Sequence, residues 1–178
     1  MAKTIKLKLI TGETALIDRT DYHLVKEYVW RRGGTENRYA ASLLDLGDTI
    51  TTIYLHRLVM CAGSKDIIDH INGNPLDCRK ENLRFVTSSQ NAANRTFTNN
   101  PFGYRGVCYF PKKRKFQARL MEGGGVFRSP YYKTPVEAAR YYDKLARGLF
   151  GEYATYNFPE EGERGVIPKK SDNEDSED

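Results

Sequence analysis

Cysteine is scarce in this chain of 178 residues, and its placement excludes two classes of small protein. Cys61, Cys78 and Cys108 are far apart and form no CxxC pair, so the sequence indicates neither a zinc knuckle nor a disulfide framework. Isolated thiols suit a reducing compartment. No apolar run has the length of a signal peptide or a membrane span, so we expect a cytoplasmic protein without a membrane partner.

Outside the end of the chain, acidic residues are fewer than basic residues. Residues 1–159 carry a net charge of +10, whereas residues 160–178 carry a net charge of −5. A basic body with an acidic tail favours a polyanionic partner, most simply nucleic acid, and no small-molecule substrate is indicated. An ordinary charged surface is the alternative interpretation. The tail has no aromatic residue, and we expect it to be disordered.

Hydrophobic periodicity predicts an α+β protein made of several short segments. Residues 1–53 predict a small α/β unit whose core is anchored by Trp30. Residues 54–95 predict a strand, a long loop, a second strand and a helix. A polar linker is expected over residues 96–103, because this stretch contains a proline and a glycine between two patterned regions. Residues 104–159 predict a three-stranded antiparallel sheet packed on one helix that begins with a capping box.

One stretch in the second segment combines the residue types that phosphodiester hydrolysis needs. Asp69 and His70 are adjacent in the sequence DHINGNPLDCRKENLRFVTSSQNAAN, which covers residues 69–94. Asn82 follows twelve residues after His70, and Asn91 follows nine residues after Asn82. A carboxylate and an amide oxygen are ligands that Mg²⁺ prefers, while histidine titrates near neutral pH.

The four side chains can therefore be given separate roles. We expect Asp69 and Asn91 to bind one divalent cation, with water and phosphate oxygens completing its coordination. His70 is the expected general base, and Asn82 would orient its imidazole. Adjacent strand residues point to opposite faces, so Asp69 and His70 must lie at a strand end. Asn94 lies on nearly the same helical face as Asn91, so helical spacing leaves these two asparagines as alternatives.

This stretch, together with the preceding LHRLVM, resembles the HNH endonuclease motif, in particular its phage and intron-encoded homing branch. The resemblance implies a ββα-metal fold over residues 54–95 within a nuclease domain over residues 1–95. It also implies one Mg²⁺ ion, for which Mn²⁺ would substitute, and no structural zinc. The third motif position is asparagine, as is usual in that branch. A bacterial cell or a phage-infected host is the expected setting.

Residues 104–159 are rich in basic side chains on and between their predicted strands. The alternation in residues 116–120 places Gln117 and Arg119 on the sheet face that points away from the helix. A charged sheet of this kind can enter the major groove, where arginine reads guanine and glutamine reads adenine. A solvated sheet face is the alternative.

The motif YRGV and the run AARYYDKLARGLFGEYATYNFP resemble the apetala-two (ethylene-response-factor) DNA-binding domain. That resemblance implies base and phosphate contacts from the sheet. Phe116 stands where tryptophan is common in that family. Two further bases border the nuclease motif. The DNA-binding candidates are Arg57, Arg84, Arg105, Lys113, Lys115, Gln117, Arg119 and Arg128.

The sequence thus predicts a site-specific homing endonuclease that acts on double-stranded DNA. One nuclease motif per chain predicts nicking by a monomer, whereas a dimer would cut both strands. A DNA-binding regulator without catalytic activity is the main alternative, and an RNA-directed nuclease or RNA binder is a third. His56 is expected to be a structural histidine, with contact to DNA or help to the metal site as the alternative.

Overall fold

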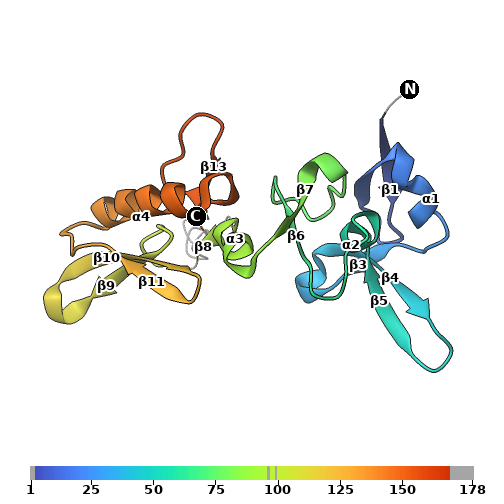
Figure 1. Cartoon of the computed structure of the whole chain (residues 1–178), viewed down its shortest axis with the longest axis horizontal. Helices are drawn as coiled ribbons and strands as arrows, with labels where there is room; N and C mark the ends of the chain where they lie inside the picture. The colour runs from blue at the N-terminus through green and yellow to red at the C-terminus, as the bar shows by residue number, and fades with distance from the viewer. Residues whose placement is uncertain (1–2, 96, 99, 169–178) are drawn as a thin grey trace, which may run out of the picture. The chain divides into compact units, whose positions relative to one another are not determined.

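The computed structural model describes residues 3–95, 97–98 and 100–168, and the chain divides into two compact units, Met1–Thr87 and Ser88–Asp178 (Figure 1). Each unit combines helices with strands, in agreement with the predicted α+β class. The boundary between the two units lies before the helix that ends the nuclease motif. This helix therefore folds with the second unit. The functional division into residues 1–95, 96–103 and 104–159 stays a prediction.

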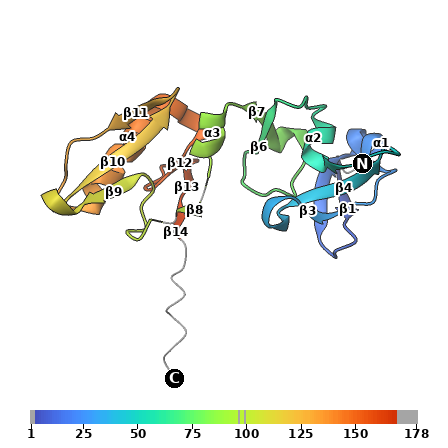
Figure 2. The same ribbon diagram turned by 90° about the horizontal axis from the view of Figure 1, so that it is seen from below.

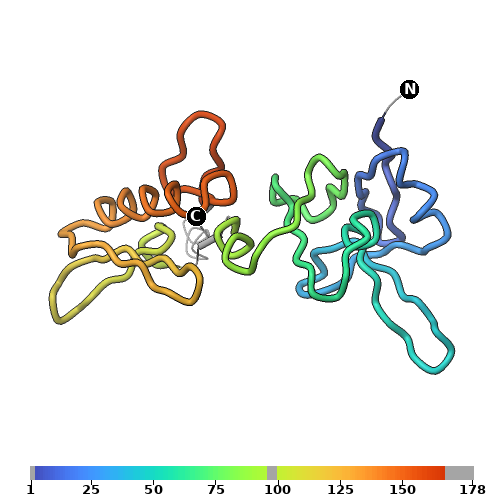
Figure 3. The backbone as a smooth tube through the Cα atoms, in the orientation of Figure 1, coloured from blue at the N-terminus to red at the C-terminus, as the bar shows by residue number. Residues whose placement is uncertain are grey.

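The first unit is built from short antiparallel ladders. Its strands are β1 (Thr4–Lys8), β2 (Thr14–Asp18), β3 (Arg31–Gly33), β4 (Tyr39–Asp45), β5 (Ile50–Tyr54), β6 (Ile67–His70) and β7 (Leu83–Val86). Its helices are α1 (Tyr22–Val25) and α2 (Leu55–Val59), with 3-10 turns η1 (Arg19–Asp21), η2 (Thr35–Asn37) and η3 (Lys80–Asn82). β1 pairs with β2, β3-β4-β5 form a sheet, and β6 pairs with β7. The tube in Figure 3 shows the β4–β5 hairpin extending from its unit.

A single apolar core joins these ladders. Trp30 is 2% exposed, and its indole Nε1 donates a hydrogen bond of 2.9 Å to the carbonyl of Val25. Ile17 from β2 and Leu55 and Val59 from α2 are fully buried in the same cluster. The prediction that Trp30 anchors the core is confirmed. The core holds α2 against the strands, and α2 begins directly after β5, so the histidine in α2 has a fixed place.

The second unit contains the predicted three strands and amphipathic helix. Its elements are α3 (Ser88–Ala93), β8 (Phe97–Thr98), β9 (Val107–Phe110), η4 (Pro111–Lys113), β10 (Lys115–Glu122), β11 (Gly125–Arg128), α4 (Pro135–Phe150), η5 (Gly151–Tyr153), β12 (Thr155–Tyr156), β13 (Arg164–Gly165) and β14 (Ile167–Pro168). The strand order of the antiparallel sheet is β11-β10-β9. Figure 2 shows α4 lying along this sheet.

Helix α4 packs on β9 and β10 through small residues. Ala138 and Ala139 are fully buried, which lets the helix approach the sheet closely. Thr134 caps the helix, and its hydroxyl accepts a hydrogen bond from the Glu137 amide while the Glu137 carboxylate accepts one from the Thr134 amide. Gly106 has φ +69°, and a Cβ there would lie 2.1 Å from the Tyr142 ring, so only glycine fits.

The start of the acidic tail differs from the prediction of disorder over residues 160–178. Residues 160–168 fold back on the second unit, where β13 pairs with β12 and β14 pairs with β8. Glu163 accepts two hydrogen bonds from Arg147 of α4, at 2.9 and 2.6 Å. This bidentate ion pair lets an acidic segment pack against a basic helix. Residues 169–178 lie outside the described residues.

Candidate active site

The Asp-His pair lies at the end of β6, as its chemistry requires. His70 is the last residue of this strand, and both side chains are buried, each with 6% exposure. In the β6–β7 ladder Asp69 lies opposite Arg84. The Arg84 guanidinium Nε is 3.0 Å from Asp69 Oδ2, so this predicted DNA-binding arginine pairs with the predicted metal ligand. The carboxylate is thus compensated by a neighbouring cation within its own hairpin.

Burial sets the protonation state of His70. It lowers the pKa of His70 to about 4, although the nearby carboxylates of Asp69 and Asp77 oppose the shift. The imidazole is therefore neutral at pH 7. A neutral imidazole can accept a proton, which is the property that a general base needs.

A second histidine lies beside His70. The ring centroids of His56 and His70 are 5.2 Å apart, and Tyr39 packs against both rings, at 5.1 Å from His56 and 6.1 Å from His70. Burial, followed by the charge effects of His70 and Arg57, lowers the pKa of His56 to about 3. Its Nδ1 is buried and has no hydrogen-bond partner among the described residues. The sequence favoured a structural role for His56. Nothing in the segment LHRLVM indicates that its ring packs against that of His70.

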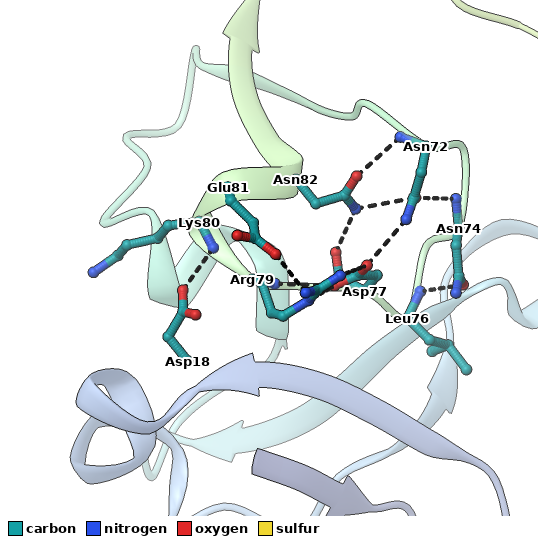
Figure 4. Close-up of polar contacts among 9 residues, drawn as sticks. All are labelled: Asp18, Asn72, Asn74, Leu76, Asp77, Arg79, Lys80, Glu81 and Asn82. Carbon is teal, nitrogen blue, oxygen red and sulfur yellow. Dashed lines mark hydrogen bonds and ion pairs between the residues drawn. The ribbon is translucent and has the colours of Figure 1, made fainter. Parts of the chain in front are cut away.

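Asn82 supports the site through the loop that follows His70 (Figure 4). Its Oδ1 accepts a hydrogen bond of 2.9 Å from the Asn72 amide, and its Nδ2 donates to Asn72 Oδ1 and to the Asp77 carbonyl, at 3.0 and 2.8 Å. All three contacts are with the loop, so the side chain orders the backbone next to His70. The predicted hydrogen bond to the imidazole itself is absent from these contacts.

Asp77 is a buried residue of this network that the sequence did not single out. It is 2% exposed and accepts hydrogen bonds from Arg79 at 2.8 and 2.7 Å and from Asn72 Nδ2 at 3.0 Å. The Arg79 hydrogen bond is the main cause that lowers the pKa of Asp77. The loop is also joined to β2, because the Lys80 amide donates to Asp18 Oδ2 at 2.8 Å. The sequence feature that could have indicated Asp77 is the cluster of turn-forming residues NGNPLD, which ends at this residue.

The two candidate asparagines for the metal differ in their surroundings. Asn91 is partly exposed on α3. Asn94 follows the helix, is 5% exposed, and its side-chain oxygen accepts a hydrogen bond from Arg164. The amide oxygen of Asn94 is thus engaged inside the second unit, which favours Asn91 as the ligand. The pairing of Asn91 with Asp69 stays a prediction.

The donor chemistry fits a hard divalent cation. Among residues 3–95, 97–98 and 100–168, no three His, Cys, Asp or Glu side chains are grouped as a metal site. Asp69 and Asn91 offer one carboxylate and one amide oxygen, which suits an ion such as Mg²⁺ that keeps several water ligands. Cys78, the cysteine within this stretch, is a poor ligand for such an ion, because burial raises the pKa of its thiol to about 12.

The sheet of the second unit presents basic side chains on the face opposite α4. Arg119 and Arg128 are exposed cross-strand neighbours on this face. Phe110 lies 4.8 Å under the Arg119 guanidinium, and Gln117 Oε1 accepts a hydrogen bond of 3.3 Å from Arg119 Nε. Gln117 is itself 6% exposed and donates to the Ser129 carbonyl. It therefore orients Arg119 and is not available to read a base.

The remaining DNA-binding candidates fall into exposed and internal groups. Lys113 and Lys115 are exposed, and the Lys113 ammonium lies 3.8 Å over the Tyr131 ring. Arg57 donates to backbone carbonyls of the loop after α2, including that of Asp66 at 2.8 Å. The Arg105 guanidinium is turned into its own unit. We therefore leave Arg105 out of the DNA-contacting set.

Comparison with known proteins supports the nuclease interpretation at a coarse level. The model of a family described as HNH endonuclease matches residues 63–93, which contain the Asp-His pair, Asn82 and Asn91. This stretch is therefore similar to an HNH endonuclease domain, and the similarity supports a nuclease function. The chain is 28% identical over 148 residues to a protein of Acanthamoeba polyphaga mimivirus named as the uncharacterized HNH endonuclease L560. That alignment covers 82% of this chain and 75% of the relative.

No solved structure matches the chain closely enough to count as similar. The resemblance of residues 104–159 to the apetala-two domain stays a prediction. No helix in the described part of the chain is long and apolar enough to cross a membrane.

Proposed function

We propose that this protein is a site-specific, metal-dependent endonuclease of the homing type that hydrolyses phosphodiester bonds in double-stranded DNA. The observation that carries the proposal is the buried, neutral His70 next to Asp69 at the end of β6, within the stretch matched to HNH endonucleases. A buried base beside a carboxylate is costly to maintain, which makes a purely structural role a weaker explanation.

His70 accepts the proton of the attacking water in this mechanism. Its neutral form is present at pH 7, and the carboxylates of Asp69 and Asp77 favour the imidazolium that forms. Asn82 keeps the following loop in place, so the imidazole stays where the water must lie. His56 is the ring neighbour that limits movement of His70 on its other side.

Asp69 and Asn91 would hold the divalent cation, Mg²⁺ or Mn²⁺. When bound, such an ion supplies positive charge for the phosphate oxygens and acidifies a ligand water. Arg84 already compensates Asp69 in the hairpin, and it would turn towards a DNA phosphate once the carboxylate binds a cation.

The exposed basic face of the second unit would deliver the DNA. Arg119 and Arg128 are like charges placed directly opposite each other, an arrangement that is unfavourable unless an anion lies between them. Lys113 and Lys115 extend the same charge. A nuclease that itself reads little sequence gains target selection from such a surface.

The test is a cleavage assay with purified protein and the DNA of the genome that encodes it. We expect nicked or linear products with Mg²⁺ or Mn²⁺ and none with EDTA. His70→Ala should slow cleavage by about 10²–10⁴-fold and leave DNA affinity nearly unchanged. His23→Ala is the matched control, because His23 is exposed on α1 and contacts only the nearby Thr20 carbonyl.

Equal cleavage by His70→Ala and the parent protein would contradict the assignment of the base. Tight DNA binding with no cleavage under any of these metal conditions would instead establish the DNA-binding regulator.

A further inference from the structure

Helix α3, which carries Asn91, is held at its carboxyl end by side chains from later in the second unit. The Arg105 guanidinium donates through Nη1 to the Arg95 carbonyl and through Nη2 to the Ala92 carbonyl. The Thr155 hydroxyl lies 2.7 Å from the same Arg95 carbonyl. Ala92 lies in the last turn of α3, where carbonyls lack partners inside the helix, and Arg95 lies two residues beyond its end. These donors therefore hold the end of the helix and the chain that follows it.

Arg105 is itself fixed before it reaches α3. Its Nε donates to the Tyr142 hydroxyl at 2.9 Å, its Nη1 donates to Thr155 Oγ1 at 2.7 Å, and its backbone amide donates to Asn157 Oδ1 at 2.6 Å. Tyr142 is a core residue of α4 with 5% exposure. The planar guanidinium has five donors in a rigid fork, which suits simultaneous contact with two helix carbonyls and two hydroxyls.

The same end of α3 is held by Arg164, which donates to the side-chain oxygen of Asn94. Residue 164 lies in β13, part of the segment that was expected to be disordered. Three separate parts of the second unit therefore converge on residues 92–95, which are the end of α3 and the two residues after it. Asn91 lies on that helix and is left partly exposed.

We propose that Arg105 is a positioning residue for the metal site: it fixes α3 so that the Asn91 amide oxygen is presented to the divalent cation. This rests on the proposed function, in which Asn91 is a metal ligand. It assigns Arg105 a role different from the DNA contact implied by the apetala-two resemblance.

The test compares full-length variants by three measurements. These are Mn²⁺ affinity from electron paramagnetic resonance in the presence of duplex DNA, DNA affinity without divalent metal, and hydrogen exchange of the α3 amides. Arg105→Gln should lower Mn²⁺ affinity by about 10-fold or more, as is typical for residues that orient a metal ligand. Exchange should accelerate at the amides of Asn94 and Arg95.

Lys144→Gln is the matched control, because Lys144 is exposed on α4 and its loss removes one positive charge from the same unit. DNA affinity should stay nearly unchanged in both Lys144→Gln and Arg105→Gln, because neither side chain belongs to the exposed sheet face that is proposed to contact DNA. Mn²⁺ affinity should fall only in Arg105→Gln. Tyr142→Phe keeps the buried ring and removes the hydroxyl that orients Arg105, so Mn²⁺ affinity should fall by roughly two- to tenfold.

Two results would overturn this inference. Unchanged Mn²⁺ affinity with a larger loss of DNA affinity in Arg105→Gln than in Lys144→Gln would make Arg105 a DNA contact. Unchanged Mn²⁺ affinity in the folded Tyr142→Phe protein would overturn it even if Arg105→Gln fails to fold.

Asn91→Ala separates this inference from the proposed function. If Asn91→Ala binds Mn²⁺ as tightly as the parent protein, the proposed metal site fails. If Asn91→Ala loses Mn²⁺ while Arg105→Gln and Tyr142→Phe retain it, only the role of Arg105 fails.

Discussion

The polar side chains proposed to be functional differ in solvent exposure between the two units of this chain. In the first unit His70, Asn82 and Asp77 are each at most 6% exposed, and Asn82 and Asp77 belong to the hydrogen-bonded segment that follows His70. In the second unit Arg119 and Arg128 are exposed on an open sheet face. Catalysis needs a few groups held in one geometry, whereas contact with a polyanion needs accessible charge. The difference in burial therefore agrees with the proposed separation of catalysis from DNA recognition.

The buried network should be the more sensitive of the two to substitution, and among variants that keep His70, Asn82→Ala should produce the largest effect. Loss of its amide frees the loop after His70, so the cleavage rate should fall by about 10–100-fold. Single-turnover cleavage at saturating DNA measures this. Asn74→Ala is the control, because Asn74 is exposed in the same loop and its side chain contacts only the backbone amide of Leu76. Equal rates for the two variants would show that Asn82 does not support the site.

Asp77→Asn tests the same network through stability and pH. The folded pKa of Asp77 lies below its usual value of 3.8, mainly because Arg79 donates hydrogen bonds to it. Its contribution to stability is therefore complete above that usual value and is lost as the pH falls towards the folded pKa. Asp77→Asn should reduce the free energy of unfolding at pH 7 by about 1–3 kcal/mol.

Thermal unfolding between pH 6 and pH 3 checks this prediction. Asp77→Asn should lose less stability over that range than the parent protein. Asp48→Asn, at the exposed end of the β4–β5 hairpin, should follow the parent protein. A parent-like pH dependence in Asp77→Asn would show that other carboxylates determine acid stability.

On the exposed sheet a single substitution should act on binding and leave chemistry unchanged. Arg119→Gln removes one cation that Phe110 and Gln117 orient, so the salt dependence of DNA binding should weaken by about one unit of slope. The cleavage rate at saturating DNA should stay within about twofold, since phosphate contacts position the DNA. Titrations at several salt concentrations measure the slope. An unchanged slope would mean that DNA does not contact this face.

The smallest effect should come from a helix cap that touches neither site. Thr134→Ala should reduce the free energy of unfolding by about 1 kcal/mol, because the capping box of α4 loses its hydroxyl. Thr134→Ser keeps the acceptor and should be nearly neutral. Denaturant unfolding measures both. A change in cleavage at saturating DNA would show that α4 acts on the chemistry more directly than its packing suggests.

Local sequence patterns predicted most of the secondary structure. The Thr134-Pro135-Val136-Glu137 run predicts the start of α4, and the alternation around Gln117 and Arg119 predicts β10 and its outward face. The Asp-His pair was expected at a strand end, and His70 ends β6. These features depend on neighbours within a few residues, which is why one sequence is enough to find them.

Other features depend on residues that meet only after folding. Nothing near His56 in the sequence shows that its ring lies beside His70. Arg105 lies at a position where the sequence predicts a DNA contact, but its guanidinium donates hydrogen bonds to Tyr142 and Thr155 within its own unit. Glu163 looks like part of a solvated acidic tail until Arg147 pairs with it.

The sequence by itself predicted the kind of chemistry, because carboxylate, imidazole and amide groups at fixed spacing limit what a protein can do to a phosphate. It also determined the basic character of the second unit. Tertiary structure decided which candidates are available for function, since burial neutralises His70 and hydrogen bonds engage Asn82, Asn94 and Arg105. Availability depends on contacts between distant residues, and a linear pattern does not contain those contacts.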